Sequence, residues 1–302
     1  MVDVSIIIIN YNTKELVQQC IDSIFSNTEG ISFEVIIVDN ASTDHSHEYF
    51  STNEKILFIR SQQNLGFGKA NNRALEIARG RNILFLNPDT VLLNNAIQIL
   101  SDYLNVHPEV GACGGNLFDG EGQPAYSHLL YFPSIFGELD RVFHYRLSRI
   151  VFGKNVYFNF TSKPLPVKYI TGADMMVRKD ILDKLKGFDP DFFMYYEDTE
   201  LGYRINKSGY IILNIPQARI VHLEGKSFEF SERRERMIFS GRSVFYSKVY
   251  SKSYFKTANF LYYIYVILAI FFSLFLNQQK KREKYIKRLK IFKEVNKDSH
   301  VV

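Results

Sequence analysis

The segment Asn87-Pro88-Asp89 places a carboxylate directly after a strongly apolar run, residues 83–86. Uninterrupted apolar residues over that length predict a strand that is buried on both faces. Proline cannot donate a hydrogen bond to a sheet, so Pro88 ends the strand. In an open α/β sheet, ligands bind at the carboxyl ends of the strands. Asp89 is therefore placed where it could hold a cation or a phosphate, although Asn-Pro-Asp is equally suited to an ordinary turn.

A set of polar residues follows other predicted strands in the same way. Each of them alone is more simply a turn or a helix cap, but parallel strands would bring all of them to one edge of the sheet. There, Asp39 could accept a hydrogen bond from a pyrimidine N–H, and Lys69 with the first amides of its helix could bind a pyrophosphate. The set, which predicts a nucleotide site, comprises Asn10, Asn12, Asp39, Asn40, Asn64, Gly66, Lys69, Asn87 and Asp89.

Two adjacent acids, Glu197 and Asp198, open a helix that we predict to reach Ser208. Acids are common at this position because they cap the first turn and interact favourably with the helix dipole. The pair also suits general base catalysis, because repulsion between neighbouring carboxylates raises a pKa toward the working range. The residues alone favour the cap.

Two common phosphate-binding motifs are absent. Gly66-Phe67-Gly68 would need a further glycine at position 71 to complete the dinucleotide fingerprint, and that residue is Asn71. Gly225-Lys226-Ser227 resembles the end of a P-loop, but Ile220 occupies the position of the leading glycine. The sequence therefore fits neither a dehydrogenase nor a P-loop ATPase.

The elements that must position these residues alternate between strand and helix over residues 1–115. Buried strands are expected at residues 4–10, 33–39, 55–60, 83–86 and 110–115. Such alternation predicts a doubly wound α/β sheet of parallel units, with a nucleotide-binding first half. Between residues 119 and 166 the pattern dissolves, and residues 136–147 predict an amphipathic helix that lies on a bilayer, covers an acceptor groove or packs in the core.

Composition indicates an ordinary folded protein. A chain of 302 residues supports one large domain or two modest ones. Its 46% hydrophobic and 23% charged residues exclude wholesale disorder. Cys20 and Cys113 lie in apolar patterns, which predicts buried thiols in a reducing compartment. The first ten residues form a predicted strand and have no basic region, so we do not expect a signal peptide.

Six motifs occur in an order that resembles the family-2 inverting glycosyltransferases of the GT-A fold. The resemblance spans about residues 3–245 and is greatest to the rhamnosyltransferase-like branch that decorates bacterial surface polysaccharides. It implies a mixed, mostly parallel sheet, a nucleotide-sugar donor, a divalent cation and a carboxylate base. The motifs are Asp39-Asn40-Ala41-Ser42, Asn64-Leu65-Gly66-Phe67, Asn87-Pro88-Asp89, Thr171-Gly172-Ala173, Glu197-Asp198-Thr199-Glu200-Leu201 and His222-Leu223-Glu224-Gly225-Lys226-Ser227.

The same resemblance implies roles for individual residues. Asp39 would hold the nucleotide base, Asp89 the metal and the diphosphate, and Asp198, beside Glu197, would be the catalytic base. Many members have Asp-x-Asp where this chain has Asn87-Pro88-Asp89, so one carboxylate is missing. Mg²⁺ or Mn²⁺ needs several oxygens besides the diphosphate. His222 could supply a further ligand, which would favour Mn²⁺, or it is an ordinary loop histidine.

The C-terminal region combines an uncharged run, residues 260–276, with a basic tail in which nine Lys or Arg face three acids. A basic tail alone could bind nucleic acid, but its apolar neighbour favours an anionic membrane surface and no nucleic acid. Seventeen residues are short for a span, and a span would carry the tail outward against the positive-inside preference. We therefore expect a peripheral or monotopic protein on the cytoplasmic face of the bacterial plasma membrane. A helix packed on the catalytic domain is the alternative.

These inferences predict an enzyme that moves a single sugar, rhamnose from dTDP-rhamnose, onto a lipid-linked or polysaccharide acceptor. A GT-A domain is expected at residues 1–245, with a nucleotide-sugar half (1–115) and an acceptor half (116–245), followed by a membrane-associated helical tail (246–302). One alternative is a UDP- or GDP-linked donor. A processive synthase is another, but its Gln-x-x-Arg-Trp motif needs a tryptophan and this chain has none. A third is a membrane-tethered binding protein with a dead site, for which Asn87 is the support.

Overall fold

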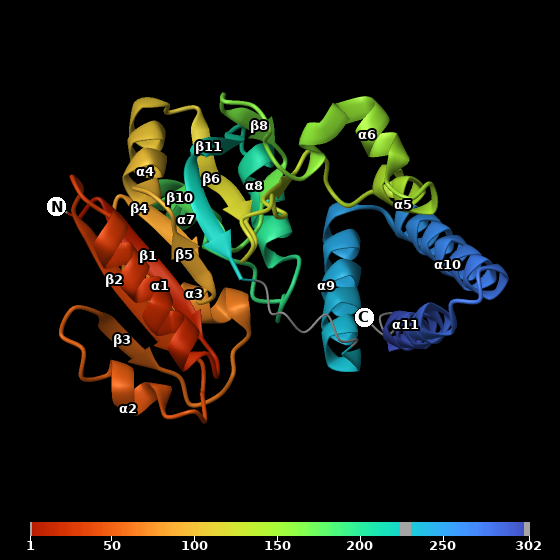
Figure 1. Ribbon diagram of the computed structural model, residues 1–302, viewed down its shortest axis with the longest axis horizontal. Coiled ribbons are helices and arrows are strands. Elements are labelled where there is room, and N and C mark those ends of the chain that lie inside the picture. Colours follow the sequence, from red (N-terminus) through yellow and green to blue (C-terminus); the bar gives the residue numbers. More distant parts are fainter. Residues whose placement is uncertain (1, 224–230, 299–302) are drawn as a thin grey trace. The chain divides into compact units, whose positions relative to one another are not determined.

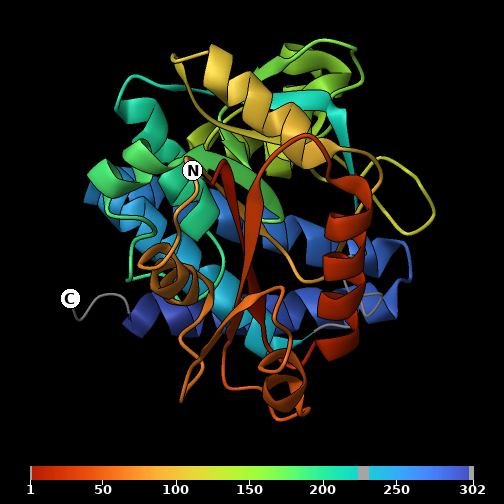
Figure 2. The same ribbon diagram turned by 90° about the vertical axis from the view of Figure 1, so that its left-hand side faces the viewer.

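The computed structural model describes residues 2–223 and 231–298, which form two compact units (Figures 1 and 2). A sheet unit contains residues 2–130, 154–193 and 197–223. A helical unit contains residues 131–153, 194–196 and 231–298. The boundaries of these compact units differ from the predicted division at residue 245. That division concerns function and stays a prediction.

The sheet unit is built on a mixed sheet with the strand order β3-β2-β1-β4-β10-β6-β11-β5, and β8 pairs with β11. The pairings β1–β2, β1–β4, β2–β3 and β6–β11 are parallel, whereas β10 runs antiparallel to both β4 and β6. The predicted doubly wound, mostly parallel α/β fold is confirmed. The strands are β1 (Val4–Asn10), β2 (Phe33–Asp39), β3 (Leu57–Arg60), β4 (Asn82–Leu86), β5 (Thr90–Leu92), β6 (Val110–Phe118), β8 (Leu165–Val167), β10 (Asp174–Arg178) and β11 (Ile211–His222), with β7 (His128–Leu129) and β9 (Tyr169–Ile170) in a separate pair.

Helices cover both faces of this sheet because both faces are apolar. Neighbouring strand residues alternate between two buried clusters: Ile6 and Leu84 pack with α1 and α4 on one face, and Ile7 and Phe85 pack with α3, α7 and α8 on the other. The sequence shows this as unbroken apolar runs. The helices of the sheet unit are α1 (Lys14–Asn27), α2 (Ser46–Phe50), α3 (Phe67–Leu75), α4 (Ala96–Val106), α7 (Lys179–Leu185) and α8 (Glu197–Lys207).

Strand ends differ from the sequence expectations where pairing extends or interrupts a strand. The strand expected at residues 110–115 continues to Phe118, because it pairs with β11 as far as Val221. β11 is a single strand from Ile211 to His222, with a register irregularity between Asn214 and Arg219. Its continuity was hidden in the sequence by Pro216, which lies inside that irregular interval. Cys20 and Cys113 are buried free thiols, as expected.

The helical unit consists of α5 (Ile135–Val142), α6 (Arg146–Phe152), α9 (Glu232–Val249), α10 (Lys252–Phe275) and α11 (Gln279–Asp298), and a 3₁₀ helix, Gly153–Val156, follows α6. The amphipathic helix expected at residues 136–147 is thus divided between α5 and α6, with His144 and Tyr145 in left-handed conformation at the break. Within the described residues, α10 alone is long and apolar enough to cross a membrane by length and composition.

Candidate active site

Asn10 and Asp39 lie level with each other at the carboxyl ends of β1 and β2, because the two strands pair in register as far as these residues. Asn10 Nδ2 donates to Asp39 Oδ1 at 2.9 Å, and both side chains are buried. Asp39 Oδ2 is buried with no hydrogen-bond partner in the described part of the chain. A buried acceptor without a donor is costly. Asp39 is therefore suited to receive an N–H from a ligand, and Asn10 positions it.

Three further residues of the predicted set hold the loops of this edge. Asn12 has a φ of 56°, and its side-chain oxygen accepts from Thr43 N at 2.7 Å. Asn40 Nδ2 donates to Asn64 Oδ1 at 3.0 Å and to the Gly66 carbonyl at 3.1 Å. Asn64 Oδ1 also accepts from Gly66 N at 2.9 Å. These amides shape the loops after β1, β2 and β3, and any contact with a ligand stays a prediction.

Gly66 precedes α3 in a conformation that requires glycine. Its φ is 79°, and a Cβ at this position would lie 2.0 Å from the Phe193 carbonyl oxygen. This close approach lets Phe67 N donate to the same oxygen at 2.9 Å, which fixes the start of the helix. Lys69, in the first turn of α3, is exposed and forms no ion pair with any described residue. Its predicted role with a pyrophosphate stays a prediction.

Asn87, Asp89 and His222 converge at the end of β4. His222 ends β11 opposite Thr90 of β5, and its Nε2 lies 3.2 Å from Asp89 Oδ1 and 3.3 Å from Asn87 Nδ2. The turn between them is held by Thr90 Oγ1, which donates to the Asn87 carbonyl at 2.7 Å. Of the motif at 222–227, Glu224 to Ser227 lie outside the described residues.

These side chains form a donor set that suits a divalent cation bound together with a diphosphate. A carboxylate, an imidazole and an amide oxygen, presented after rotation of Asn87, are all known ligands of Mn²⁺. Among the described residues no group of three His, Cys, Asp or Glu is placed to hold a metal. The protein's own ligands are thus too few for a closed metal site, and oxygens of a donor would have to complete the coordination.

The acid pair opens α8, as predicted, but its two carboxyl groups have different surroundings. Asp198 Oδ2 accepts from Gly172 N at 2.9 Å and Oδ1 accepts from Thr199 N at 2.6 Å. Burial raises the pKa of Asp198, and these hydrogen bonds oppose that rise. Glu197 is 5% exposed, and burial, together with the charge of Asp198, raises its pKa to about 8. Near neutral pH Glu197 is therefore protonated, which leaves the better exposed Asp198 as the candidate base.

The segment Thr171-Gly172-Ala173 connects the acid pair to the Asn87-Pro88-Asp89 turn. Gly172 N donates to Asp198, and the Ala173 carbonyl accepts from Asn87 N at 3.0 Å. Two neighbouring residues therefore fix the catalytic base candidate on one side and the Asn87-Pro88-Asp89 turn on the other. This explains physically why that short motif accompanies the two acidic ones.

Asp174 is a candidate site residue that the sequence analysis missed. It opens β10 opposite Leu86, is fully buried, and has one oxygen bonded to Gly115 N while Oδ1 has no partner among the described residues. Burial raises the pKa of Asp174 to about 7, and the nearby charge of His222 counteracts this. An acid inside the apolar run 173–177 was the available signal.

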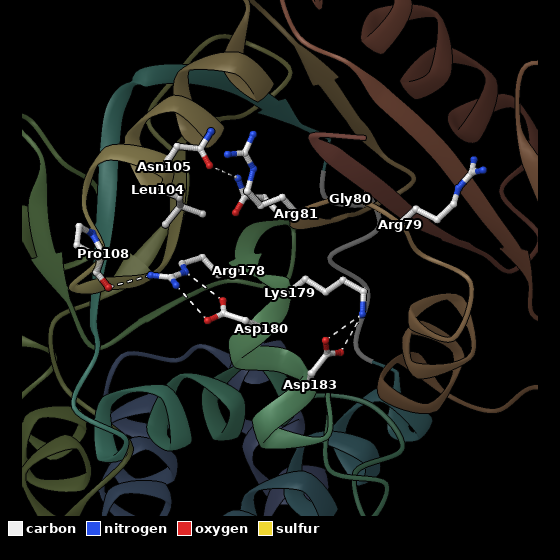
Figure 3. Close-up of a pocket in the computed structure, with 11 residues that line it drawn as sticks. Arg79, Gly80, Arg81, Leu104, Asn105, Pro108, Arg178, Lys179, Asp180 and Asp183 are labelled. Carbon is white, nitrogen blue, oxygen red and sulfur yellow. Dashed lines mark hydrogen bonds and ion pairs between the residues drawn. The ribbon is translucent and has the colours of Figure 1, made fainter. Parts of the chain in front are cut away.

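The opposite edge of the sheet contains a cavity of about 520 Å³ whose lining is basic (Figure 3). It lies where β4 begins and β10 ends, and no residue of the predicted site lines it. Its cations are paired: Arg178 with Asp180 at 3.0 Å and Lys179 with Asp183 at 2.9 Å inside the lining, and Arg79 and Arg81 with acids outside it. This cavity is therefore not the candidate active site.

A model of the family "Glycosyl transferase family 2" matches residues 5–186. This chain belongs to glycosyl transferase family 2. The resemblance inferred from the motifs is thereby confirmed. The acid pair and His222 lie beyond the matched residues, so their roles rest on the geometry of the site.

Curated relatives include rhamnosyltransferases. The chain is 27% identical over 208 residues to N-acetylglucosaminyl-diphospho-decaprenol L-rhamnosyltransferase of Mycobacterium tuberculosis, a match that covers 64% of this chain and 67% of the relative. It is 24% identical over 216 residues to the O-antigen chain rhamnosyltransferase WbaN of Salmonella anatum, covering 71% of this chain and 62% of that protein. The rhamnosyltransferase-like branch is the one to which this chain is similar.

Solved structures with the same fold include two glycosyltransferases. Mannosyltransferase PcManGT from Pyrobaculum calidifontis, in complex with GDP-Man and Mn²⁺, superposes with a TM-score of 0.58 at 15% identity, over 96% of this chain and 86% of that one. GalNAc-T7 with UDP, GalNAc and Mn²⁺ superposes with a TM-score of 0.57 at 15% identity, over 82% of this chain and 50% of that one. These likenesses establish the GT-A fold.

Proposed function

We propose that this family-2 glycosyltransferase transfers a single rhamnose, with inversion, from dTDP-rhamnose to a lipid-linked or polysaccharide acceptor in bacterial surface glycan synthesis. One observation carries the proposal: residues 171–173 join the Asn87, Asp89 and His222 cluster to Asp198 through two backbone hydrogen bonds. A cation-binding turn and a base are thereby held at one edge of the sheet. The choice of rhamnose rests on the names of the two curated relatives.

The donor's base and phosphates would bind the loops after β1, β2 and β3. Asp39 Oδ2 is the buried acceptor that lacks a donor, and a pyrimidine N–H is the group that would satisfy it. Lys69 lies in the first turn of α3, and the helix dipole together with backbone N–H groups after Phe67 would attract a diphosphate. A thymine and a uracil present the same N–H, so this contact alone does not choose between dTDP and UDP.

Asp89 and His222 would hold the divalent cation, with Asn87 turning its amide oxygen toward it. The cation, Mn²⁺ or Mg²⁺, would neutralise charge on the departing nucleotide diphosphate. Histidine as a ligand favours Mn²⁺ over Mg²⁺, which prefers oxygen. Mn²⁺ is present in both of the solved structures with this fold.

Asp198 would accept the proton of the acceptor hydroxyl while that oxygen attacks the anomeric carbon. The bond to the diphosphate breaks on the opposite face, so one displacement inverts the configuration and releases the nucleotide diphosphate. The hydrogen bonds from Gly172 and Thr199 fix the carboxylate, and the raised pKa of Asp198 makes it a stronger base than an exposed aspartate. Glu197 beside it is protonated near neutral pH and does not compete for the proton.

The enzyme would act on the cytoplasmic face of the plasma membrane, where it meets a lipid-linked acceptor. The relative from Mycobacterium tuberculosis is named for a diphospho-decaprenol acceptor, and α10 offers an apolar surface for association with the membrane. A UDP- or GDP-linked donor is the second candidate, favoured by the nucleotides in the two solved structures. The dead-site alternative rests on Asn87 alone and predicts binding without turnover.

The test is release of nucleotide diphosphate from a panel of dTDP-, UDP- and GDP-sugars, with Mn²⁺ or Mg²⁺ and an N-acetylglucosaminyl diphospho-lipid as acceptor. We expect the greatest turnover with dTDP-rhamnose and Mn²⁺, and a product whose anomeric configuration is opposite to that of the donor. Greater turnover with another nucleotide sugar would mean that this sugar, and not dTDP-rhamnose, is the donor. Tight binding of a donor with no turnover on any acceptor would support the binding protein instead.

A further inference from the structure

The helix α10 has two faces with opposite environments. Ala258, Tyr262, Val266, Ala269 and Ser273 recur at helical spacing and are buried within the helical unit. On the other face, aromatic and aliphatic side chains are exposed, with 63% of Phe260, 51% of Phe271 and 79% of Phe275 accessible. Burial covers 28% of the most apolar stretch, whereas a core helix of a soluble protein is mostly buried. We call the exposed set the apolar stripe: Phe260, Tyr263, Ile267, Phe271, Leu274 and Phe275.

The basic helix α11 runs antiparallel along α10. Asn259 contacts Asn296 at 3.1 Å, the rings of Tyr262 and Phe292 are 4.6 Å apart, and the hydroxyls of Tyr265 and Tyr285 are 3.3 Å apart. Residue numbers rise along α10 while those of the contacting residues fall along α11, so the two helices run in opposite directions. Figures 1 and 2 both show the two helices side by side. α11 therefore lies beside α10 for most of its length.

The length of α10 does not decide whether it crosses a membrane, but its pairing with the basic helix α11 does. Its 24 residues would extend about 36 Å, which is enough for a hydrocarbon core of about 30 Å. A spanning α10 would however carry α11 into the bilayer beside it. α11 contains nine Lys or Arg, each of which costs roughly 2.5–3.5 kcal/mol at the bilayer centre. A hairpin of these two helices is compatible with the surface of a membrane and not with its interior.

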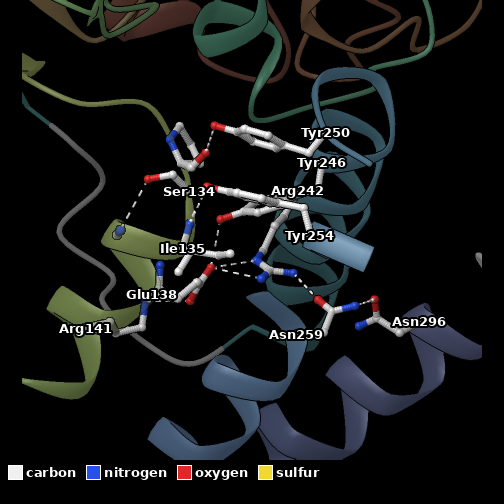
Figure 4. Close-up of polar contacts among 12 residues, drawn as sticks. Ser134, Ile135, Glu138, Arg141, Arg242, Tyr246, Tyr250, Tyr254, Asn259 and Asn296 are labelled. Atoms are coloured by element: carbon white, nitrogen blue, oxygen red, sulfur yellow. Dashed lines mark hydrogen bonds and ion pairs between the residues drawn. The ribbon is translucent and has the colours of Figure 1, made fainter. Parts of the chain in front are cut away.

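The core of the helical unit keeps α10 in this arrangement (Figure 4). Arg242 of α9 donates to Glu138 of α5 at 2.9 Å and to Asn259 of α10 at 2.6 Å, and both charged side chains are only 3% exposed. Asn259 in turn donates to Asn296 of α11. Separating α10 from α9 would deprive the buried Arg242 guanidinium of its Asn259 acceptor, which is unfavourable.

Basic side chains adjoin the apolar stripe. Lys293 of α11 lies over the Tyr263 ring at 5.3 Å, so a cation of one helix borders the exposed face of the other. Lys280, Lys281, Lys284 and Lys290 of α11 are also exposed. An apolar face bordered by lysines is complementary to the boundary between acyl chains and anionic head groups.

We propose that α10 lies parallel to the surface of an anionic phospholipid bilayer, with the apolar stripe among the upper acyl chains and the α11 lysines on the head groups. This inference deepens the proposed function, because it rests on transfer to a membrane-borne acceptor. It assigns the membrane contact to six named side chains of a prefolded helical hairpin and requires no transmembrane segment.

Depth measurement tests the orientation of α10 directly. The chain contains no Trp, so Phe260→Trp, Ile267→Trp and Phe275→Trp each give a single Trp fluorophore on the stripe. Lipids brominated at different acyl positions would quench all three at similar shallow depths, about 5–10 Å below the head groups. Positions 260 and 275 are about 22 Å apart along a helix axis. A difference of that order, with position 267 between them, would show that α10 crosses the bilayer and would overturn the inference.

Val106→Trp is the matched control, because Val106 in α4 of the sheet unit is 69% exposed and should not be quenched. Two further results would also overturn the inference. Absence of quenching at all three stripe positions would mean that the stripe does not enter the bilayer. Trp emission that is already blue-shifted in the absence of vesicles, and that does not change when vesicles are added, would mean that a second copy of the chain covers the stripe.

Charge substitutions test separately the contributions of the apolar stripe and of the α11 lysines to membrane binding. Phe271→Glu with Phe275→Glu should lower partition onto phosphatidylglycerol vesicles by about 100-fold or more, since burial of each Phe side chain is lost. Lys284→Glu with Lys290→Glu should lower it about 10-fold on anionic vesicles and little on phosphatidylcholine. Val106→Glu should change neither. Unchanged binding in the two stripe variants would contradict the proposal.

Donor turnover separates this inference from the proposed function. All of these variants should release nucleotide diphosphate at the parental rate with a water-soluble acceptor analogue, because none alters the candidate active site. Parental turnover without any binding to vesicles would refute the membrane contact alone. Vesicle binding without turnover in the parent protein would refute the proposed function and leave the membrane contact intact.

Discussion

The two edges of the sheet carry acids in opposite electrostatic situations. At the amino edge acids meet cations: Glu34 pairs with Arg79 at 2.6 Å, Asp3 with Arg81 at 2.6 Å and Asp180 with Arg178 at 3.0 Å. At the carboxyl edge, no Lys or Arg of the described residues pairs with the site acids, and the basic side chain that contacts one of them, Asp89, is His222. Those acids are Asp39, Asp89, Asp174, Glu197 and Asp198.

This difference indicates which edge is built for ligands. Ion pairs within the amino edge are complete, so an added ligand would have to displace an existing partner. The carboxyl edge instead concentrates acids without a Lys or Arg partner, and the burial of Asp39, Asp174 and Glu197 is unfavourable unless protons, a cation or a ligand's donors compensate. The raised pKa values of Glu197 and Asp174 show protons in this role, because a protonated carboxyl group carries no charge. Substitutions at the carboxyl edge should therefore differ in effect from matched substitutions elsewhere in the sheet unit.

The largest effect is expected at Asp198. Asp198→Asn keeps the side chain's size and removes its basicity, so transfer should fall on the order of 10²–10⁴-fold while donor binding is nearly unchanged. Single-turnover rates and donor dissociation constants would be measured together. Asp180→Asn at the amino edge is the control and should change transfer less than twofold. More than half of the activity retained in Asp198→Asn would eliminate this residue as the base.

Asp89 is expected to link donor binding to the metal. Asp89→Ala removes the carboxylate of the Asn87-Pro88-Asp89 turn, so affinity for Mn²⁺ and for the donor should fall together, by about 100-fold. His222→Ala should act less, chiefly by lowering the affinity for Mn²⁺ relative to Mg²⁺. Calorimetric titration of donor with each cation measures both effects. Full activity in the presence of EDTA would remove the metal role from both residues.

The pH dependence of stability should have opposite signs at the two edges. The folded-state pKa of Glu197, about 8, lies above its ordinary value of 4.5, so its contribution to stability is complete below pH 4.5 and is lost as the pH rises through 8. Glu197→Gln, measured by urea unfolding in EDTA, should therefore lose less stability than the parent between pH 5 and 8. A pKa that differs by one between the folded and unfolded states corresponds to about 1.4 kcal/mol of unfolding free energy.

Glu34 provides the contrasting measurement. Burial raises its pKa, but hydrogen bonds from Ser5 and Arg79 outweigh burial and leave the pKa lowered. Its contribution is therefore present above its unfolded-state pKa and is lost as the pH falls. Glu34→Gln should be less stable than the parent at neutral pH, with the difference disappearing in acid. The same sign of pH dependence in both variants would contradict the electrostatic difference between the edges.

The smallest effect concerns the backbone of the loop before α3. Gly66→Ala should destabilise the fold by roughly 1–3 kcal/mol, because the left-handed conformation and the approach of the Phe193 carbonyl both disfavour a Cβ. Gly122→Ala is a matched control: its φ is 76°, but nothing lies within 4 Å of the added Cβ. Thermal unfolding should show the larger loss at Gly66. Equal losses would mean that the close contact adds nothing.

Helix and strand positions in the first half of the chain were largely predictable because their signals are local. Unbroken apolar runs identified β1, β2 and β4, and turn residues marked their ends. β5 was missed because Thr90–Leu92 is short and forms only by pairing with β11. The end of α5 within residues 136–147 was also missed; α5 packs against α10, which follows about a hundred residues later.

The sequence by itself determined that polar residues follow buried strands, because burial pattern and turn chemistry are properties of a few neighbouring residues. It therefore indicated Asn10, Asp39, Asp89 and the acid pair as site residues. Tertiary structure decided that His222 meets Asp89, since those residues are 133 positions apart and only the pairing of β11 with β5 brings them together. It also decided that Asp174 is buried beside this cluster and that α10 pairs with a basic helix. Distances between remote side chains and the dielectric around them arise from packing, which no local pattern encodes.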